Sequence, residues 1–225
     1  MVVSALLSVF AVTLYFIPKS TDANEVYNQS LYNVVEIKAE SENVGESFGT
    51  GIILSDNGLI VNNAHVITYT RIGLAKEFDK CFIRFAFEDE YRTVKLEKYD
   101  TDIDLAVLSL EDFSDINLKP IKINRTSSLK AGDKVYAVGN AANYGIGIFE
   151  GIVSIPLLNI EIDGKLRSVI QCDLAIAAGN SGGALLNDKG ELVGITTFRT
   201  KDTSGNVIYG IVYCIPLNTL LEYIN

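Results

Sequence analysis

Residues 178–185 read Ala178-Gly179-Asn180-Ser181-Gly182-Gly183-Ala184-Leu185, a serine set among glycines and followed by an apolar run. Glycine has no Cβ, so it permits tight turns and close backbone approaches that other residues forbid. An acyl-transfer enzyme needs that freedom, because backbone N–H groups must converge on the oxygen that becomes negative. Ser181 is therefore a candidate nucleophile, with the N–H groups of Gly179 and Ser181 as donors. Gly-Ser clusters also mark ordinary turns, so the interpretation depends on the rest of the chain.

The pattern around this octapeptide is nearly all strand. About a dozen short apolar runs, separated by turn signals such as Asp56-Asn57-Gly58 and Asp163-Gly164, favour a sandwich or a barrel over alternating βαβ units. Residues 111–132 are polar and predict a connection between two halves. We expect a short C-terminal helix over 217–224 and strands over 31–39, 48–55, 59–63, 81–87, 91–99, 105–110, 134–139, 146–155, 159–162, 166–174, 184–186, 192–199 and 207–215.

Composition argues against several classes of protein. The 225 residues carry a net charge of −9 without a run of Lys or Arg, which disfavours a nucleic-acid partner. The three cysteines, Cys81, Cys172 and Cys214, form no C-x-x-C pair, and one histidine cannot complete a usual zinc set, so we expect no metal site. A Cys172–Cys214 disulfide stays open, although three buried thiols acting as small hydrophobes is the favoured interpretation.

The N-terminal segment is the least polar part of the chain. Residues 1–17 carry no charged side chain and stop at Pro18-Lys19. Such a segment is the core of a signal peptide or a short membrane anchor. We therefore expect an apolar helix within 1–18, which attaches the chain to a membrane if it is uncleaved, then a polar linker over 19–30. The remainder is expected to be exported.

A serine nucleophile needs a base that works near neutral pH, and His65 is the only imidazole in the chain. A buried carboxylate must in turn hold the imidazole in the correct tautomer. Asp104 precedes the apolar strand over 105–108 and suits that role, but Asp102 competes with it on the same grounds. The order histidine, aspartate, serine belongs to the chymotrypsin arrangement.

Three blocks in this order resemble the HtrA/Deg family of trypsin-like serine proteases: 49–66 around His65, 102–108, and 171–183 around Ser181. The resemblance covers about residues 31–217 and selects Asp104 over Asp102. It implies an all-β fold of two antiparallel six-stranded β-barrels, over about 31–115 and 120–216, within a protease domain at 31–225. It also implies a catalytic triad of His65, Asp104 and Ser181, an oxyanion hole at Gly179, Asn180 and Ser181, and no cofactor.

The same resemblance implies a serine endopeptidase that cleaves unfolded or damaged exported polypeptides, often as a homotrimer built through the N-terminal segment, for which Tyr27 and Tyr32 are aromatic candidates. Many members carry a PDZ domain after the protease domain, and this sequence contains none. Ala175, six residues before the serine, corresponds to the base of the substrate pocket, and Val212 should narrow it. An uncharged, narrow pocket predicts small aliphatic side chains before the cut.

Two alternatives stay open at this point. One is a protease-fold module that binds unfolded chains and cuts little or nothing. The family often has Asn-Pro before the Gly-Asn-Ser motif, whereas this chain has Ala177-Ala178, so the sequence constrains the oxyanion loop less tightly. The other alternative is an esterase that uses the same triad.

Overall fold

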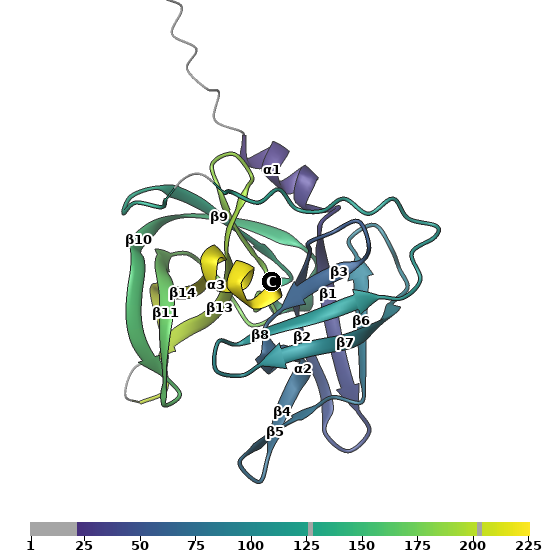
Figure 1. Ribbon diagram of the computed structural model, residues 1–225. Helices are drawn as coiled ribbons and strands as arrows, with labels where there is room; N and C mark the ends of the chain where they lie inside the picture. Colours follow the sequence, from purple (N-terminus) through teal and green to yellow (C-terminus); the bar gives the residue numbers. More distant parts are fainter. Residues whose placement is uncertain (1–21, 126–127, 202–203) are drawn as a thin grey trace, which may run out of the picture.

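The computed structural model of the protein describes residues 22–125, 128–201 and 204–225. Two closed six-stranded barrels lie side by side, one built by the first half of the chain and one by the second (Figure 1). The prediction of an all-β fold with two antiparallel six-stranded barrels is confirmed. The expected apolar helix within 1–18 lies outside the described residues.

The first barrel has the strand order β1-β2-β3-β8-β7-β6, and every neighbouring pair is antiparallel. A short helix, α2, follows β3, and a small two-stranded sheet of β4 and β5 comes next. The bounds are β1 Val34–Ser41, β2 Gly45–Ile53, β3 Leu59–Asn62, α2 Ala64–Ile67, β4 Thr68–Arg71, β5 Leu74–Glu77, β6 Lys80–Phe85, β7 Arg92–Asp100 and β8 Leu105–Leu110.

The second barrel has the order β10-β11-β14-β13-β12-β9, again with antiparallel neighbours. A single 3-10 turn, η1, lies between β9 and β10, and the helix α3 follows β14. The bounds are β9 Lys134–Gly139, η1 Ala141–Asn143, β10 Gly147–Ile162, β11 Lys165–Asp173, β12 Ala184–Asn187, β13 Leu192–Lys201, β14 Val207–Pro216 and α3 Leu217–Ile224.

Several strands bury side chains on both faces, which explains their unbroken apolar runs. Side chains alternate between the two faces of a strand. In β1, Val35 and Ile37 join the core inside the first barrel, whereas Val34 joins a cluster shared by the two barrels. Ile60 and Val61 divide in the same way in β3. The shared cluster joins the two barrels through buried side chains of both.

The structure differs from the sequence-based expectation at the start of the described chain. Residues 23–30, expected to be a polar linker, form the helix α1 (Ala23–Ser30). Its polar face carries side-chain hydrogen bonds one turn apart, such as Asn28 Nδ2 to Asn24 Oδ1 at 2.9 Å. Val26 is only 1% exposed and packs into the cluster shared by the barrels. A single apolar anchor within a polar segment is too weak a pattern to predict a helix.

Two further elements differ from the expectation. The expected strands over 146–155 and 159–162 are one long strand, β10, whose pairing with β11 shifts register after Val153 and again after Ile155. Such bulges bend a strand without ending it, so Pro156 does not break the ladder completely. The hairpin of β4 and β5 was not expected, because its second strand is fully exposed and lacks an alternating apolar pattern.

Helices play a minor part. The expected C-terminal helix forms as α3, which packs against β13 and β14 (Figure 1). Within residues 22–125, 128–201 and 204–225, no helix has the length and apolar character needed to span a bilayer.

Candidate active site

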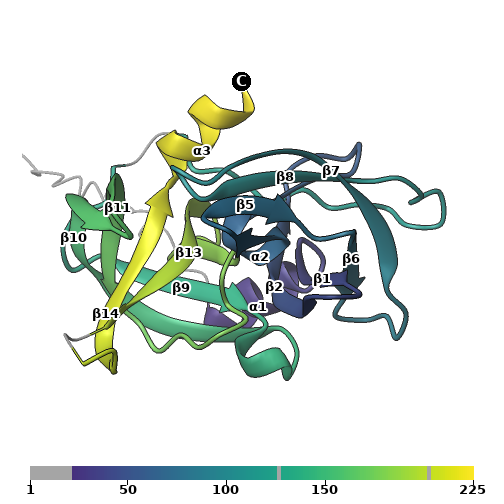
Figure 2. The same ribbon diagram turned by 90° about the horizontal axis from the view of Figure 1, so that it is seen from below.

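The one-turn helix α2 lies at the boundary between the barrels (Figure 2). It carries His65, whose side chain meets that of Asp104. His65 Nδ1 is 2.8 Å from Asp104 Oδ2, and the backbone N–H of His65 donates to Asp104 Oδ1 at 3.0 Å. With Nδ1 donating to the carboxylate, Nε2 carries the lone pair. Asp104 is 3% exposed, so its charge is sheltered from water and acts strongly on the imidazole. This pair can accept a proton at Nε2 and stabilise the resulting cation.

The backbone at Asp104 adopts the left-handed conformation, with φ of +59°. Aspartate tolerates this region better than most residues, although at a cost of about 1–3 kcal/mol. The carbonyl of Asp104 accepts hydrogen bonds from Asn63 Nδ2 at 2.9 Å and from the N–H of Ala64 at 3.3 Å. These contacts hold the aspartate loop against the start of α2, so the carboxylate and the imidazole keep a fixed relation.

Asp102, the competing carboxylate, lies elsewhere. Its side chain is 80% exposed and forms an ion pair with Lys165 at 2.7 Å. The hydrogen bond from Lys165 lowers the pKa of Asp102. The structure therefore brings Asp104, and not Asp102, to His65.

Ser181 lies across the boundary on the second barrel, in the turn between β11 and β12. Its Oγ donates to the carbonyl of Thr197 at 3.3 Å. Rotation about one side-chain bond would redirect this hydroxyl, and in unliganded enzymes the hydrogen bond between nucleophile and base is often long or unformed. The hydroxyl of Thr197 donates to Asp104 Oδ2 at 2.6 Å, so one residue of β13 contacts both ends of the predicted triad.

The residues before Ser181 form a turn that exposes a backbone donor. The N–H of Asn180 donates to the carbonyl of Ala177 at 3.2 Å, and Gly179 between them has φ of +94°. A positive φ at the third position is the signature of a type II turn. The carbonyl of Ala178 accepts from the N–H of Ala142 in η1 at 2.6 Å. Because N–H and C=O of a trans peptide point in opposite directions, the N–H of Gly179 points away from η1.

The N–H groups of Gly179 and Ser181 make no hydrogen bond to any described residue, so both are available to an incoming oxyanion. The backbone N–H of Asn180, the third residue predicted for the oxyanion hole, is already engaged. This N–H closes the turn onto Ala177, and the Asn180 carbonyl accepts from the N–H of Gly183 at 2.9 Å. The backbone N–H of Asn180 is therefore part of the turn, whereas its side-chain amide is buried and makes no hydrogen bond to a described residue.

Thr50 of β2 ties the serine loop to the first barrel. Its N–H donates to the carbonyl of Ser181 at 2.8 Å, and its hydroxyl donates to the carbonyl of Gly179 at 2.7 Å. Gly182, directly after the serine, must be glycine, because a Cβ there would lie 2.2 Å from the carbonyl oxygen of Thr50. The close approach of the two barrels thus explains one glycine of the motif.

Neither Thr50 nor Thr197 was identified from the sequence as a site residue. Both are ordinary strand threonines in their local pattern, and Thr197 lies beside the equally polar Thr196. Thr197 reaches Asp104 over a separation of 93 residues, which no local pattern encodes. Only the apposition of the barrels distinguishes these hydroxyls from those of other buried threonines.

The two residues predicted for the substrate pocket lie in β14 and in the loop after β11. Ala175 is exposed and uncharged, in the loop that follows β11. Val212 pairs with Cys172 across β14 and β11, and it is 3% exposed among the core side chains of the second barrel. The role of Val212 as a wall of the pocket stays a prediction.

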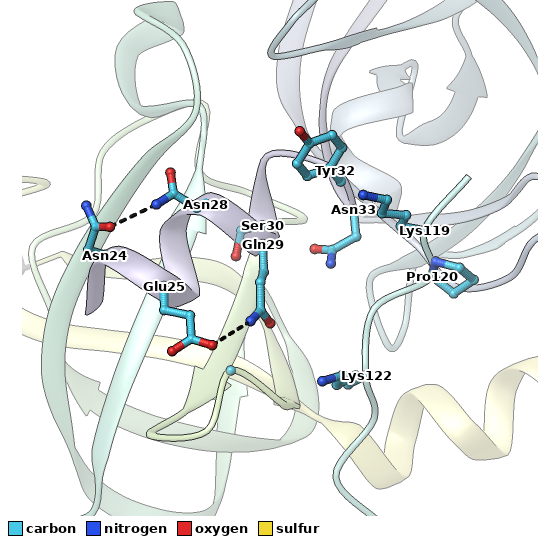
Figure 3. A pocket seen from close by; sticks show the side chains of 11 residues that line it. Asn24, Glu25, Asn28, Gln29, Ser30, Tyr32, Asn33, Lys119, Pro120 and Lys122 are labelled. Carbon is cyan, nitrogen blue, oxygen red and sulfur yellow. Dashed lines mark hydrogen bonds between the residues drawn. The ribbon is translucent and has the colours of Figure 1, made fainter. Parts of the chain in front are cut away.

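A separate cavity of about 530 Å³ lies between α1 and the segment 119–122 (Figure 3). Amide side chains and two lysines line it, and Lys119 Nζ sits 3.9 Å from the centre of the Tyr32 ring. None of the residues predicted to act in catalysis contributes to it.

Within the described chain, no three His, Cys, Asp or Glu side chains gather as a metal site would require, and Cys172 and Cys214 are free, buried thiols.

Comparison with known proteins identifies the family of the chain. A family described as "Trypsin-like peptidase domain" matches residues 49–195. The probable periplasmic serine endoprotease DegP-like of Buchnera aphidicola subsp. Baizongia pistaciae is 38% identical over 176 residues, 76% of this chain and 34% of that protein. Serine endoprotease DegS of Haemophilus influenzae is 34% identical over 195 residues, 86% of this chain and 53% of that protein.

Solved structures agree with the sequence relatives. The HtrA-type protease AlgW with a tripeptide superposes with a TM-score of 0.75 at 28% identity, covering 88% of this chain and 61% of that one. A serine endoprotease from Yersinia pestis gives a TM-score of 0.71 at 29% identity, covering 91% and 65%. The chain spans between a third and about half the length of the two sequence relatives. On these grounds the chain belongs to the family of trypsin-like peptidase domains, with serine endoproteases of the HtrA type among its relatives.

Proposed function

We propose that this protein is a serine endopeptidase in which Ser181, His65 and Asp104 form the catalytic triad. The observation that carries the proposal is the Asp104 carboxylate, which is buried and accepts hydrogen bonds from both His65 Nδ1 and the Thr197 hydroxyl. A buried aspartate in this position orients the imidazole and stabilises its cation, which is the requirement of the triad mechanism. The relatives named serine endoproteases support the same activity.

The reaction proceeds by acyl transfer. Ser181 Oγ turns from the Thr197 carbonyl toward His65 Nε2, loses its proton to that nitrogen and attacks the carbonyl carbon of the peptide bond. The oxyanion binds the N–H groups of Gly179 and Ser181, which are directed by the type II turn. His65 then gives the proton to the leaving amine, and water hydrolyses the acyl-enzyme by the same steps.

The proposed substrates are unfolded or damaged polypeptides outside the cytoplasm. Relatives named periplasmic support an extracytoplasmic location. The absence of a charge at Ala175 disfavours cleavage after Lys or Arg, and we propose small aliphatic residues such as Val or Ala before the cut. A homotrimer is proposed from the resemblance alone. Tyr27 donates its hydroxyl to the carbonyl of Ile146, which leaves Tyr32, 45% exposed, as the better candidate for a contact between subunits.

The test combines a fluorophosphonate probe, which labels activated serines, with digestion of unfolded casein by the wild-type protein and by Ser181→Ala. Removal of the nucleophile should abolish labelling and lower the cleavage rate by about 10⁶-fold. Casein binding without cleavage or labelling in the wild type would contradict the proposal in favour of a binding module. Turnover of simple esters with no cleavage of casein would point instead to an esterase.

A further inference from the structure

The loop 140–146, between β9 and β10, sets the direction of one proposed oxyanion donor. The N–H of Ala142 donates to the carbonyl of Ala178 at 2.6 Å, and this contact turns the N–H of Gly179 away from the loop. The carbonyl of Asn140 lies so close to Gly179 that a Cβ there would be 2.1 Å from its oxygen. A change in the shape of this loop would therefore release the Ala178–Gly179 peptide and misdirect the donor.

The loop has a backbone conformation that needs support from outside. Ala142 and Asn143 both lie in the left-handed region, with φ of +54° and +62°. Residues with a Cβ visit this region singly and at a cost, and alanine has no polar side chain with which to offset that cost locally. Such conformations persist only where surrounding contacts hold the backbone. The contacts at the two ends of the loop therefore decide whether Ala142 keeps its place beside Ala178.

The start of the loop is held by the first barrel. The N–H of Asn140 donates to the Thr50 hydroxyl at 2.9 Å, and Asn140 Oδ1 accepts from the N–H of Gly145 at 2.9 Å. Asn140 is 2% exposed, so both bonds are sheltered from water. The position of Asn140 is thus fixed by residues of the site already described.

The end of the loop is held by the helix α1. The hydroxyl of Tyr27 donates to the carbonyl of Ile146 at 3.1 Å, across 119 positions of sequence. Val26, the preceding residue of α1, joins the same buried cluster as Ile146. The helix also contacts β9 and β10, the strands that flank the loop (Figures 1 and 2). A segment that precedes the first barrel therefore supports a loop of the second.

We propose that Tyr27 is a positioning residue for the oxyanion hole. By holding Ile146, it keeps the loop 140–146 in its left-handed form, which holds Ala178 and thereby directs the N–H of Gly179. The inference rests on the proposed function, because the oxyanion hole belongs to that same site. It assigns a part in catalysis to a helix that carries none of the triad residues.

The substitution Tyr27→Phe tests it in the full-length protein, because it removes the hydroxyl and keeps the ring. A typical hydrogen bond changes the balance between two conformations by about fivefold, and here the strain of the loop favours the relaxed form. We expect kcat on a peptide substrate to fall about three- to tenfold after correction for folded fraction, with KM within about twofold of the wild type. The amide proton of Ala142, followed by NMR, should exchange with solvent at least about threefold faster.

A double-mutant cycle shows through which residue Tyr27 acts. In the Gly179→Ala background, where the donor is already misdirected, Tyr27→Phe should change kcat by less than about 1.5-fold. A merely structural loss would lower kcat by the same factor in both backgrounds. Tyr144→Phe is the matched control, because Tyr144 lies in the same loop and is 94% exposed. It should leave kcat and the exchange of the Ala142 amide unchanged.

Hydrogen exchange needs no catalysis, so the two levels of the argument can fail separately. An unchanged exchange rate at Ala142 in Tyr27→Phe would overturn the proposal whatever the activity. Equal losses of kcat in the two backgrounds would refute the path through Gly179. If the wild type shows no Ser181-dependent cleavage, the proposed function itself fails, and the part assigned to Tyr27 in catalysis fails with it.

Discussion

Replacing Gly179 by alanine should disable the oxyanion hole while leaving the triad intact. A Cβ at this position would lie 2.1 Å from the carbonyl oxygen of Asn140, a rigid backbone atom, and would also disfavour the φ of +94°. The turn can relieve both by rotating its central peptide from the type II to the type I form. That rotation reverses the Ala178–Gly179 peptide, so a carbonyl oxygen takes the place of the N–H donor.

The size of the effect follows from the loss of one oxyanion donor, which costs about 10²–10³ in kcat, or about 2.7–4 kcal/mol. We expect Gly179→Ala to lower kcat on a peptide substrate by at least that factor with a much smaller change in KM. The rate of fluorophosphonate labelling should fall in parallel. Steady-state hydrolysis and time-resolved labelling measure the two quantities.

The matched control is Gly132→Ala. Gly132 has φ of +89°, and a Cβ added there would meet no other atom within 4 Å, so this variant shares the backbone strain without the clash. Its kcat should remain within about twofold of the wild type after correction for folded fraction, since the strain of about 1–3 kcal/mol acts on stability only. A Gly179→Ala enzyme with kcat within about threefold of the wild type would refute the account of the turn, because the loss of a donor costs far more than that.

Three further outcomes are expected. Asp104→Asn should lower kcat by about 10⁴-fold while the protein stays folded, whereas Asp102→Asn should leave kcat within about threefold of the wild type. Equal losses of kcat in a peptide assay would contradict the assignment of Asp104 to the triad. Thr197→Val removes a hydrogen bond to the Asp104 carboxylate and should lower kcat by about tenfold; an unchanged kcat would show that this hydroxyl is dispensable. Burial raises the pKa of the Cys81 thiol to about 11 from 9.0, so the unfolded chain releases this proton at lower pH than the folded one. The stabilising contribution of the Cys81 thiol to the free energy of unfolding is therefore fully present below about pH 9 and is lost as the pH rises to about 11. Cys81→Ala should show a shallower fall in Tm over that range. Identical slopes of Tm against pH in the two proteins, measured by circular dichroism, would count against this account.

Sequence reasoning succeeded where the signal is local. The barrel strands were predictable because apolar runs and turn residues repeat at short spacing, and a strand buried on both faces, such as that containing Ile60 and Val61, reads as a continuous apolar run. The same logic failed for α1, which depends on a single buried anchor at Val26, and for the exposed hairpin of β4 and β5. It also divided β10, because a bulge and a strand end look alike in sequence.

The residues of the candidate site likewise fall into those that the sequence predicted and those that only the structure identified. The sequence was sufficient to predict which types of side chain form the site: one histidine, a serine among glycines, and an aspartate before an apolar strand. The choice of Asp104 over Asp102 needed a family resemblance. Only the tertiary structure brought Thr197 to Asp104 and Thr50 to the serine loop, and set the direction of the Gly179 N–H through the contact of Ala178 with Ala142. The two threonine contacts cross from one barrel to the other, and the contact of Ala178 with Ala142 joins two loops of the second barrel. All of them join residues tens of positions apart, and the spacing of residues along the chain does not specify which hydroxyls and N–H groups will face each other in the folded protein.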